Sequence, residues 1–134
     1  RRERKTRPRV PRSRARGLTA PRAGVITVER PVMPAQGFAS FRDFYPYYLS
    51  EHANTTSRRL HFFGTTLFIG QVVAALATGN AWLLLTGAVS AYALAWLGHF
   101  GFEKNRPATF RFPFYSLMGD FAMFRDILLG RIRW

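Results

Sequence analysis

Residues 60–102 form a continuous apolar stretch that contains no Asp, Glu, Lys or Arg. Its 43 residues are enough for two membrane-spanning helices, because one span needs about 20 predominantly apolar residues. Gly79 and Asn80 lie in its middle and form a dipeptide that is typical of turns. The pattern therefore predicts two antiparallel spans, at about 57–78 and 81–100, joined by a very short connection.

A segment with one apolar face precedes this stretch. Ser40 and Asp43 have the spacing of a capping box, which predicts that a helix begins there. At 100° per residue, four side chains of that helix share one face: Phe41, Tyr45, Tyr48 and His52.

A second such segment follows the stretch, with apolar side chains at helical spacing: Leu117, Phe121, Phe124 and Leu128. We expect both flanking helices to lie at the membrane surface. The predicted fold class is all-α, an integral membrane two-helix hairpin with flanking amphipathic interfacial helices. A soluble buried hairpin is the alternative, but a chain this small could hardly cover two apolar helices on every side.

The positive charge is concentrated near the N-terminus. The chain carries a formal net charge of +13, and residues 1–36 hold eleven Arg or Lys and two Glu, which gives this segment a charge of +9. Its prolines break any long helix, so we expect a disordered basic tail at 1–36 and a membrane helical domain at 37–134. The first Met is Met33, which favours a native start near that residue. The tail lacks a helix-turn-helix pattern and interleaved aromatic residues, which argues against nucleic-acid binding.

The charges that flank the two spans predict their orientation. Arg58 and Arg59 precede the first span, and the connection between the spans is uncharged. By the positive-inside rule, both termini then lie in the cytoplasm. Three more cations after the second span agree with this orientation: Lys104, Arg106 and Arg111.

The three histidines give the clearest indication of chemistry, because the chain has no cysteine to supply a thiolate ligand or nucleophile. His61 and His99 are equally far from the turn, so an antiparallel hairpin places them side by side at its cytoplasmic end. His52 lies nine residues before His61. The cap-forming residues 53–57 between them predict a helix break that lets His52 fold back toward His61.

Glu103 lies four residues after His99 and would share its face on a continuous helix. Two or three imidazoles with a carboxylate and open positions suit iron(II) and oxygen chemistry, whereas the lack of thiolates argues against a structural zinc site. We therefore interpret His52, His61, His99 and Glu103 as candidate metal ligands, with Asp120 as a residue that could orient one of them. The alternative is that the histidines anchor the helices at the membrane interface and that Glu103 pairs with a nearby cation.

Three segments resemble a family of small membrane proteins named for a fungal 2-hydroxy fatty acid dioxygenase: FYPYYLSEHANTTSRRLHFFGTTL, AWLGHFGFEKNRPATF and FPFYSLMGDFAMFRDILLG. The resemblance covers about residues 38–131, and its core motifs are HANTTSRRLH and GHFGFEKNRPA. It implies an enzyme of α-oxidation that shortens a 2-hydroxy fatty acid by one carbon with Fe(II) and dioxygen. The family's essential histidines correspond to His52, His61 and His99, and Glu103 belongs to the same motif. The chain is similar to a short, bacterial-type member, which implies a bacterial inner membrane.

Two other functions are compatible with these residues. His61 and His99, at matched depth on neighbouring helices, suit the two axial ligands of a haem. The chain could instead be a non-enzymatic membrane scaffold or lipid-binding protein whose His and Arg side chains bind headgroups. For the enzyme, the expected partners are a fatty acid or lipid substrate, dioxygen and the membrane. A pair of helices is a thin frame for an active site, so a homo-oligomer is a further expectation.

Overall fold

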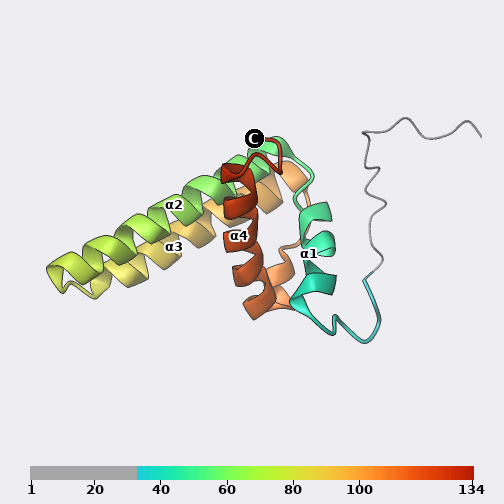
Figure 1. The fold of residues 1–134 in the computed structure, drawn as a ribbon, viewed down its shortest axis with the longest axis horizontal. Helices are drawn as coiled ribbons and strands as arrows, with labels where there is room; N and C mark the ends of the chain where they lie inside the picture. The colour runs from blue at the N-terminus through green and yellow to red at the C-terminus, as the bar shows by residue number, and fades with distance from the viewer. Residues whose placement is uncertain (1–32) are drawn as a thin grey trace, which may run out of the picture.

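In the computed structural model of the chain, the described residues are 33–134, and they form helices and no strand. This agrees with the all-α prediction for that part of the chain. The predicted tail at 1–36 lies almost entirely outside the described residues. The structure has two parts, an extended helical hairpin and a group of shorter elements at its open end (Figure 1). We call that group the base.

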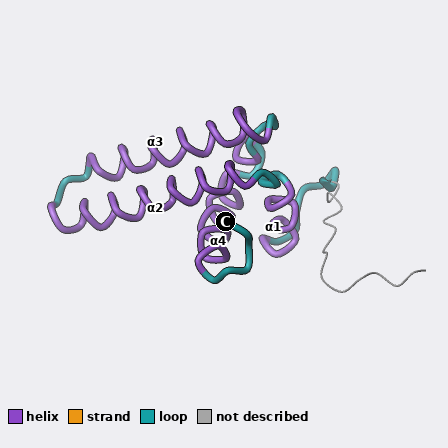
Figure 2. Tube along the Cα trace, turned by 90° about the horizontal axis from the view of Figure 1, so that it is seen from above, coloured by secondary structure: helices purple, strands orange, loops and turns teal. Residues whose placement is uncertain are grey.

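The hairpin consists of α2 (Thr55–Thr78) and α3 (Trp82–Leu97), and α3 continues into a π-helix, η1 (Gly98–Glu103). The two helices lie side by side and antiparallel, with the connection at the far end (Figure 2). Gly79 ends α2 with a φ of 68°, a left-handed conformation that favours glycine. The structure therefore has a helix at each predicted span and the turn between them, with ends that differ by at most three residues.

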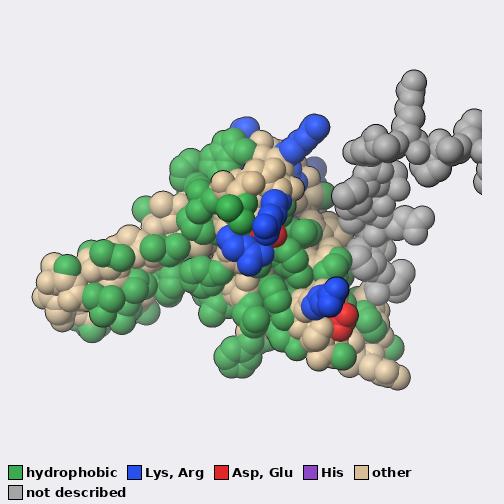
Figure 3. Space-filling view, in the orientation of Figure 1, with side chains coloured by type: hydrophobic (Ala, Val, Ile, Leu, Met, Phe, Trp, Pro, Cys, Tyr) green, Lys and Arg blue, Asp and Glu red, His purple; other side chains and the backbone are tan. Residues whose placement is uncertain are grey.

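Large apolar side chains cover the outside of the hairpin. Leu76 is 80% exposed and Trp82 is 72% exposed. Only 22% of the most apolar part of α2, and 17% of that of α3 with η1, is buried inside the protein. Figure 3 shows apolar and uncharged surface along the hairpin, whereas the Lys and Arg side chains in view gather at the base. The two helices are thus long and apolar enough to cross a membrane, and they lack the burial of a soluble protein's core helix.

The base contains α1 (Phe41–Ser50), a short 3₁₀ helix η2 (Ala108–Phe110) and α4 (Pro113–Leu128). α1 packs against α4, and α4 also contacts α2 and η2. Their buried apolar side chains form one small core: Phe44, Tyr48, Ala108, Met123 and Ile127. Because α1 and α4 pack against each other beside the open end of the hairpin, side chains from both helices can reach the histidines.

Two caps fix where the chain changes direction before the hairpin. The Ser40 hydroxyl accepts a hydrogen bond of 3.3 Å from the Asp43 N–H, so the predicted helix start is confirmed. The Asn54 side chain accepts from the Thr56 N–H at 2.8 Å and begins α2. The residues between Ser50 and Thr55 are not helical. The predicted break between His52 and His61 is therefore present.

α4 buries a different face from the one that its apolar spacing marks. Its buried residues are Ser116, Gly119, Met123, Asp126 and Ile127, of which only Met123 and Ile127 are large and apolar. Of the predicted apolar face, Leu117, Phe121 and Leu128 are exposed. α4 thus buries small and polar residues together with Met123 and Ile127, and it leaves most of its predicted apolar face exposed.

Candidate metal centre

Three histidines from three segments meet where the hairpin joins the base. His52 follows the last turn of α1, His61 lies in the second turn of α2, and His99 lies in η1. They are 1%, 6% and 3% exposed, respectively. The predicted pairing of His61 and His99 is present, because their ring centroids are 5.1 Å apart. His52 folds back onto both, with ring centroids 4.4 Å from His61 and 4.6 Å from His99.

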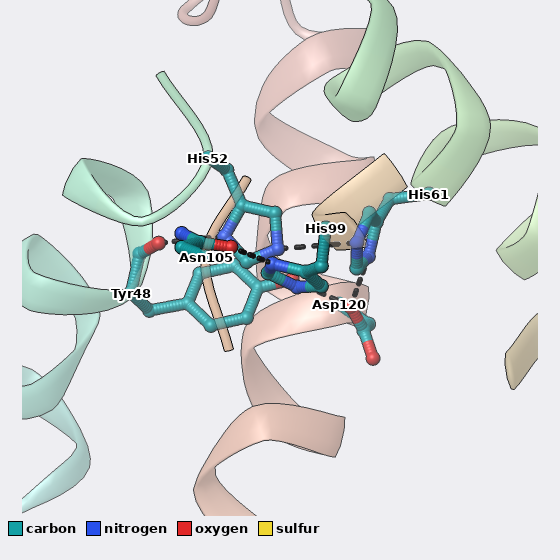
Figure 4. Close-up of polar contacts among 6 residues, drawn as sticks. All are labelled: Tyr48, His52, His61, His99, Asn105 and Asp120. Carbon is teal, nitrogen blue, oxygen red and sulfur yellow. Dashed lines mark hydrogen bonds and ion pairs between the residues drawn. The ribbon is translucent and has the colours of Figure 1, made fainter. Parts of the chain in front are cut away.

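The ring nitrogens of the three histidines converge (Figure 4). One nitrogen from each lies within 4.8 Å of those from the other two, a spacing that suits ligands of a single metal ion. The closest pair is Nε2 of His52 and Nε2 of His61, 3.2 Å apart. Among residues 33–134, this is the one group of three or more His, Asp or Glu side chains with metal-binding spacing.

Hydrogen bonds fix the orientation of two of the rings. Nδ1 of His52 lies 2.7 Å from the backbone carbonyl oxygen of Tyr48. Nδ1 of His61 lies 2.8 Å from Oδ1 of Asp120. A carbonyl or carboxylate oxygen can only accept, so Nδ1 of both rings carries the proton and donates. Asp120 therefore holds the orienting position that the sequence analysis allowed for it.

The third ring is fixed through an amide. Nδ1 of His99 lies 2.8 Å from Oδ1 of Asn105. Nδ2 of Asn105 donates to the backbone oxygen of Glu51 at 3.0 Å and to its carboxylate Oε2 at 2.9 Å. Those two acceptors determine which end of the amide is which, so Oδ1 of Asn105 must accept the proton from His99.

All three Nδ1 atoms are therefore protonated donors, and in a neutral ring Nε2 is then an unprotonated lone-pair donor. Two such lone pairs facing each other at 3.2 Å repel unless a cation lies near both. Ligating histidines usually donate their other N–H to a carboxylate, carbonyl or water, and these rings follow that pattern. The donor set thus fits a divalent metal ion.

The centre has room for an ion and an electrostatic environment that suits one. A space of about 10 Å³ lies among the three histidines, Tyr48 and Asp120, which is close to the volume of one water-sized sphere. Burial, followed by the influence of the other two histidines, lowers the pKa of His52 well below its usual value. The ring is therefore neutral at pH 7 and available as a ligand.

Tyr48 and Gly119 hold Asp120 in place. The Tyr48 hydroxyl donates to Oδ1 of Asp120 at 2.5 Å. Burial and the charge of Asp120 raise the pKa of Tyr48 well above its usual value, so the phenol keeps its proton. A Cβ at Gly119 would lie 2.7 Å from the Tyr48 ring, so only glycine lets α4 approach this closely.

Glu103 does not join the histidines. Its Oε1 accepts a hydrogen bond of 2.8 Å from the backbone N–H of Asn54, at the start of α2. Glu103 is the last residue of the π-helix at 98–103, and its carboxylate binds at the start of α2 instead of facing the imidazoles. The carboxylate beside the imidazoles comes instead from Asp120.

An apolar cavity of about 180 Å³ adjoins the centre between α2, α3 and α4. His61 and Asp120 lie at its polar end, and both also line the space at the metal centre. Its other walls are apolar or small side chains, among them Phe68, Ala91, Tyr92 and Phe121. The cavity can hold a narrow apolar group whose polar end faces His61.

Sequence reasoning missed the supporting residues Asn105 and Glu51. Asn105 is six residues after His99, a spacing that no regular helix marks as a contact. It returns to His99 because Lys104 takes a left-handed conformation, with a φ of 52°, and ends the π-helix. The signal available in the sequence was the motif GHFGFEKNRPA, which contains Asn105.

Comparison with known proteins gives one clear result. Residues 38–132 match the family described as 2-hydroxy-palmitic acid dioxygenase Mpo1-like. All three histidines, Asn105 and Asp120 lie inside the matched range. Comparison with curated proteins and with solved structures gives no match.

Proposed function

The chain belongs to the 2-hydroxy-palmitic acid dioxygenase Mpo1-like family, and from this premise we propose that it is a membrane-embedded, iron-dependent dioxygenase of 2-hydroxy fatty acids. The observation that carries the proposal is the set of three buried imidazoles, each with Nδ1 bound to an acceptor and Nε2 left for a metal. The proposed ligands, and the proposed essential residues, are His52, His61 and His99.

Iron(II) bound by three neutral imidazoles, with positions left open, would supply the activation of dioxygen. The protein's own contribution is to hold and insulate that centre. The carbonyl of Tyr48, the amide of Asn105 and the carboxylate of Asp120 fix the three rings and their protons. Asp120 also places a negative charge beside the site, which favours a bound cation.

The apolar cavity supports a fatty acyl substrate. Its polar end at His61 and Asp120 is the place for the carboxylate and 2-hydroxyl, and its apolar walls suit the adjoining methylene groups. With about 180 Å³, the cavity takes part of a long chain. We propose that the rest lies along the exposed apolar side chains of the hairpin and α4, among them Leu117 and Phe121.

The proposed setting is a membrane crossed by the hairpin, with the base at the interface. Every Lys and Arg of residues 58–111 lies at the open end of the hairpin, so the positive-inside rule favours a base and termini on the cytoplasmic side. Because lipid would then surround α2 and α3, their exposed apolar side chains need no protein partner. A fatty acid could reach the cavity from the leaflet.

The haem alternative has less support. A porphyrin needs a wide flat slot between its axial ligands, whereas the space among the three imidazoles is about 10 Å³. His52 also occupies the position next to both His61 and His99. A Soret band in the purified protein would nevertheless revive this alternative.

Turnover tests the proposal. We expect the full chain, purified in detergent and loaded anaerobically with Fe(II), to convert 2-hydroxypalmitate and dioxygen into the fatty acid one carbon shorter, with C1 released as carbon dioxide and one water formed. Palmitate, which lacks the 2-hydroxyl, serves as the matched control substrate. His99→Ala should abolish the product while the helical circular dichroism remains. Full activity in that variant, or no product from the wild type with about one iron per chain, would overturn the proposal.

A further inference from the structure

A second and larger cavity lies in the base. It measures about 650 Å³, within the range of small-molecule sites. It is formed by α1 and the segment 106–112, and it shares only the Pro107 and Ala108 walls with the space at the histidines. Four polar side chains line it: Tyr47, Glu51, Arg106 and Arg111. The metal centre and the acyl cavity do not use Arg106, Arg111 or Tyr47.

The charges in this cavity are held apart. Among residues 33–134, neither Arg106 nor Arg111 has a carboxylate oxygen within 4.0 Å. Arg106 lies over the ring of Phe110, 5.0 Å from its centroid, and Arg111 contacts Sδ of Met33 at 3.3 Å. Glu51 faces the same space, although its Oε2 accepts from Asn105 at 2.9 Å. One cavity wall therefore offers two guanidinium groups, and another offers a carboxylate.

Tyr47 adds a hydroxyl donor to the same cavity. Burial, followed by the neighbouring charge of Glu51, raises the pKa of Tyr47, so its phenol keeps the proton. Two arginines and a phenol can donate together to the oxygens of a phosphate. The Glu51 carboxylate accepts and would bind an ammonium group of the same ligand.

The rim of the cavity continues into the apolar surface of the hairpin. Phe110 lines the cavity, is 50% exposed and stacks on Trp96 of α3, with ring centroids 6.0 Å apart. Trp96 itself is 42% exposed near the open end of the hairpin. A ligand whose polar end fills the cavity can therefore extend apolar chains over these rings and along α3.

We infer that this cavity binds the phosphoethanolamine headgroup of a membrane lipid, with the phosphate at Arg106 and Arg111 and the ammonium at Glu51. The inference rests on the proposed insertion of the hairpin in a membrane, but it does not depend on the metal. A primary ammonium has three N–H donors for Glu51, whereas the quaternary ammonium of choline has none. A lipid with a purely anionic headgroup would place no cation beside Glu51.

Native mass spectrometry of the full chain in a neutral detergent tests this inference. The protein is equilibrated with equimolar phosphatidylethanolamine, phosphatidylglycerol and phosphatidylcholine of identical acyl chains. We expect phosphatidylethanolamine to be retained about tenfold more than the other two, the effect of one charge-assisted hydrogen-bonded contact. Equal retention of the three lipids would overturn the inference.

Substitutions test which residues bind the phosphate and which residue binds the ammonium of the headgroup. Arg106→Gln and Arg111→Gln should each weaken retention of phosphatidylethanolamine about tenfold, whereas Arg42→Gln, an exposed arginine of α1 outside the cavity, should not change it. Glu51→Gln should remove the preference over phosphatidylcholine, while its amide oxygen can still accept from Asn105. Unchanged retention in Arg106→Gln and Arg111→Gln, or an unchanged preference in Glu51→Gln, would contradict the assignment.

Two further measurements distinguish a lipid from a soluble ligand, and the lipid site from the metal centre. Soluble glycerophosphoethanolamine and inorganic phosphate, at the concentration of the lipid, should not displace it, because neither has acyl chains to lie on Phe110 and Trp96. Displacement by either would overturn the lipid assignment. Iron content measured on the same samples reports on the histidines, so failure of the lipid site and failure of the metal centre are separate results.

Discussion

Nε2 of His52 and Nε2 of His61 lie 3.2 Å apart, although the two residues belong to segments separated by a helix break. Each ring donates its Nδ1–H to an acceptor, Tyr48 O in one case and Asp120 Oδ1 in the other. The two facing nitrogens therefore bring lone pairs together in the interior. With His99 beside both, the three rings are placed so that a single metal ion could bind all of them.

Asp120 should control the affinity of the centre for metal. Asp120→Ala removes the acceptor of the His61 Nδ1–H, and loss of such a partner usually lowers metal affinity 10–100-fold. Asp120→Asn keeps an oxygen that accepts from His61, so its metal affinity should fall less than that of Asp120→Ala. Titration against a chelator of known affinity measures both variants. Wild-type affinity in Asp120→Ala would show that this carboxylate does not support the metal.

Asn105 should act on the same centre from the opposite side. Asn105→Ala removes the acceptor of the His99 Nδ1–H and frees the ring to turn, so we expect metal affinity to fall at least about tenfold. Asn80→Ala, in the exposed turn of the hairpin, is the matched loss of an amide and should leave affinity unchanged. Equal effects of the two substitutions would mean that Asn105 has no special part in holding His99.

Gly119 should be required for the packing of α4 on α1. In Gly119→Ala the new Cβ would meet the Tyr48 ring at 2.7 Å, and relieving such a clash typically costs about 1–3 kcal/mol in the free energy of unfolding. Gly70→Ala is the control, because a Cβ there meets nothing within 4 Å. Thermal unfolding in detergent compares them. If Gly119→Ala is as stable as Gly70→Ala, the close approach of α4 to Tyr48 is contradicted.

The sequence predicts the hairpin, its turn, the capped start of α1 and the approach of the three histidines, because each follows from local patterns or from the symmetry of His61 and His99 about Asn80. It does not predict the position of Glu103, because the contact that holds this carboxylate, with the Asn54 N–H, joins residues that are 49 apart in the sequence. The roles of Asn105 and Glu51 depend on contacts between α1 and the segment after η1, and no periodicity encodes them. The sequence also does not predict the buried face of α4, since that face combines small and polar residues with only two large apolar ones, Met123 and Ile127.

Asp126 should make the free energy of unfolding depend on pH in the acidic range. Burial raises its pKa, but hydrogen bonds from Tyr45, Arg125 and Arg131 outweigh this and lower the pKa below its usual value. A carboxylate whose pKa is lowered by folding stabilises the protein at pH values above its pKa in the unfolded chain, which is near 4. This stabilisation is lost as the pH falls through its pKa in the folded protein. Asp126→Asn should therefore lower the free energy of unfolding by about 1–3 kcal/mol at pH 7.

The pH profile distinguishes this role from a general loss of packing. The difference between wild type and Asp126→Asn should be constant from about pH 5 to 8 and shrink as the pH falls below 4. Chemical unfolding followed by circular dichroism at several pH values measures it. A difference that stays the same down to pH 2.5 would mean that the charge of Asp126 contributes nothing.

The metal content of the purified chain tests the three-histidine centre. The protein is prepared anaerobically in detergent, reconstituted with Fe(II), freed of loose metal and analysed by elemental mass spectrometry. We expect about one iron per chain in the wild type and in Glu103→Gln, which keeps an acceptor for the Asn54 N–H, and at least a tenfold loss in His52→Ala, His61→Ala and His99→Ala. A wild type without stoichiometric metal, or histidine variants that retain it, would contradict the central claim that these three imidazoles form a metal centre.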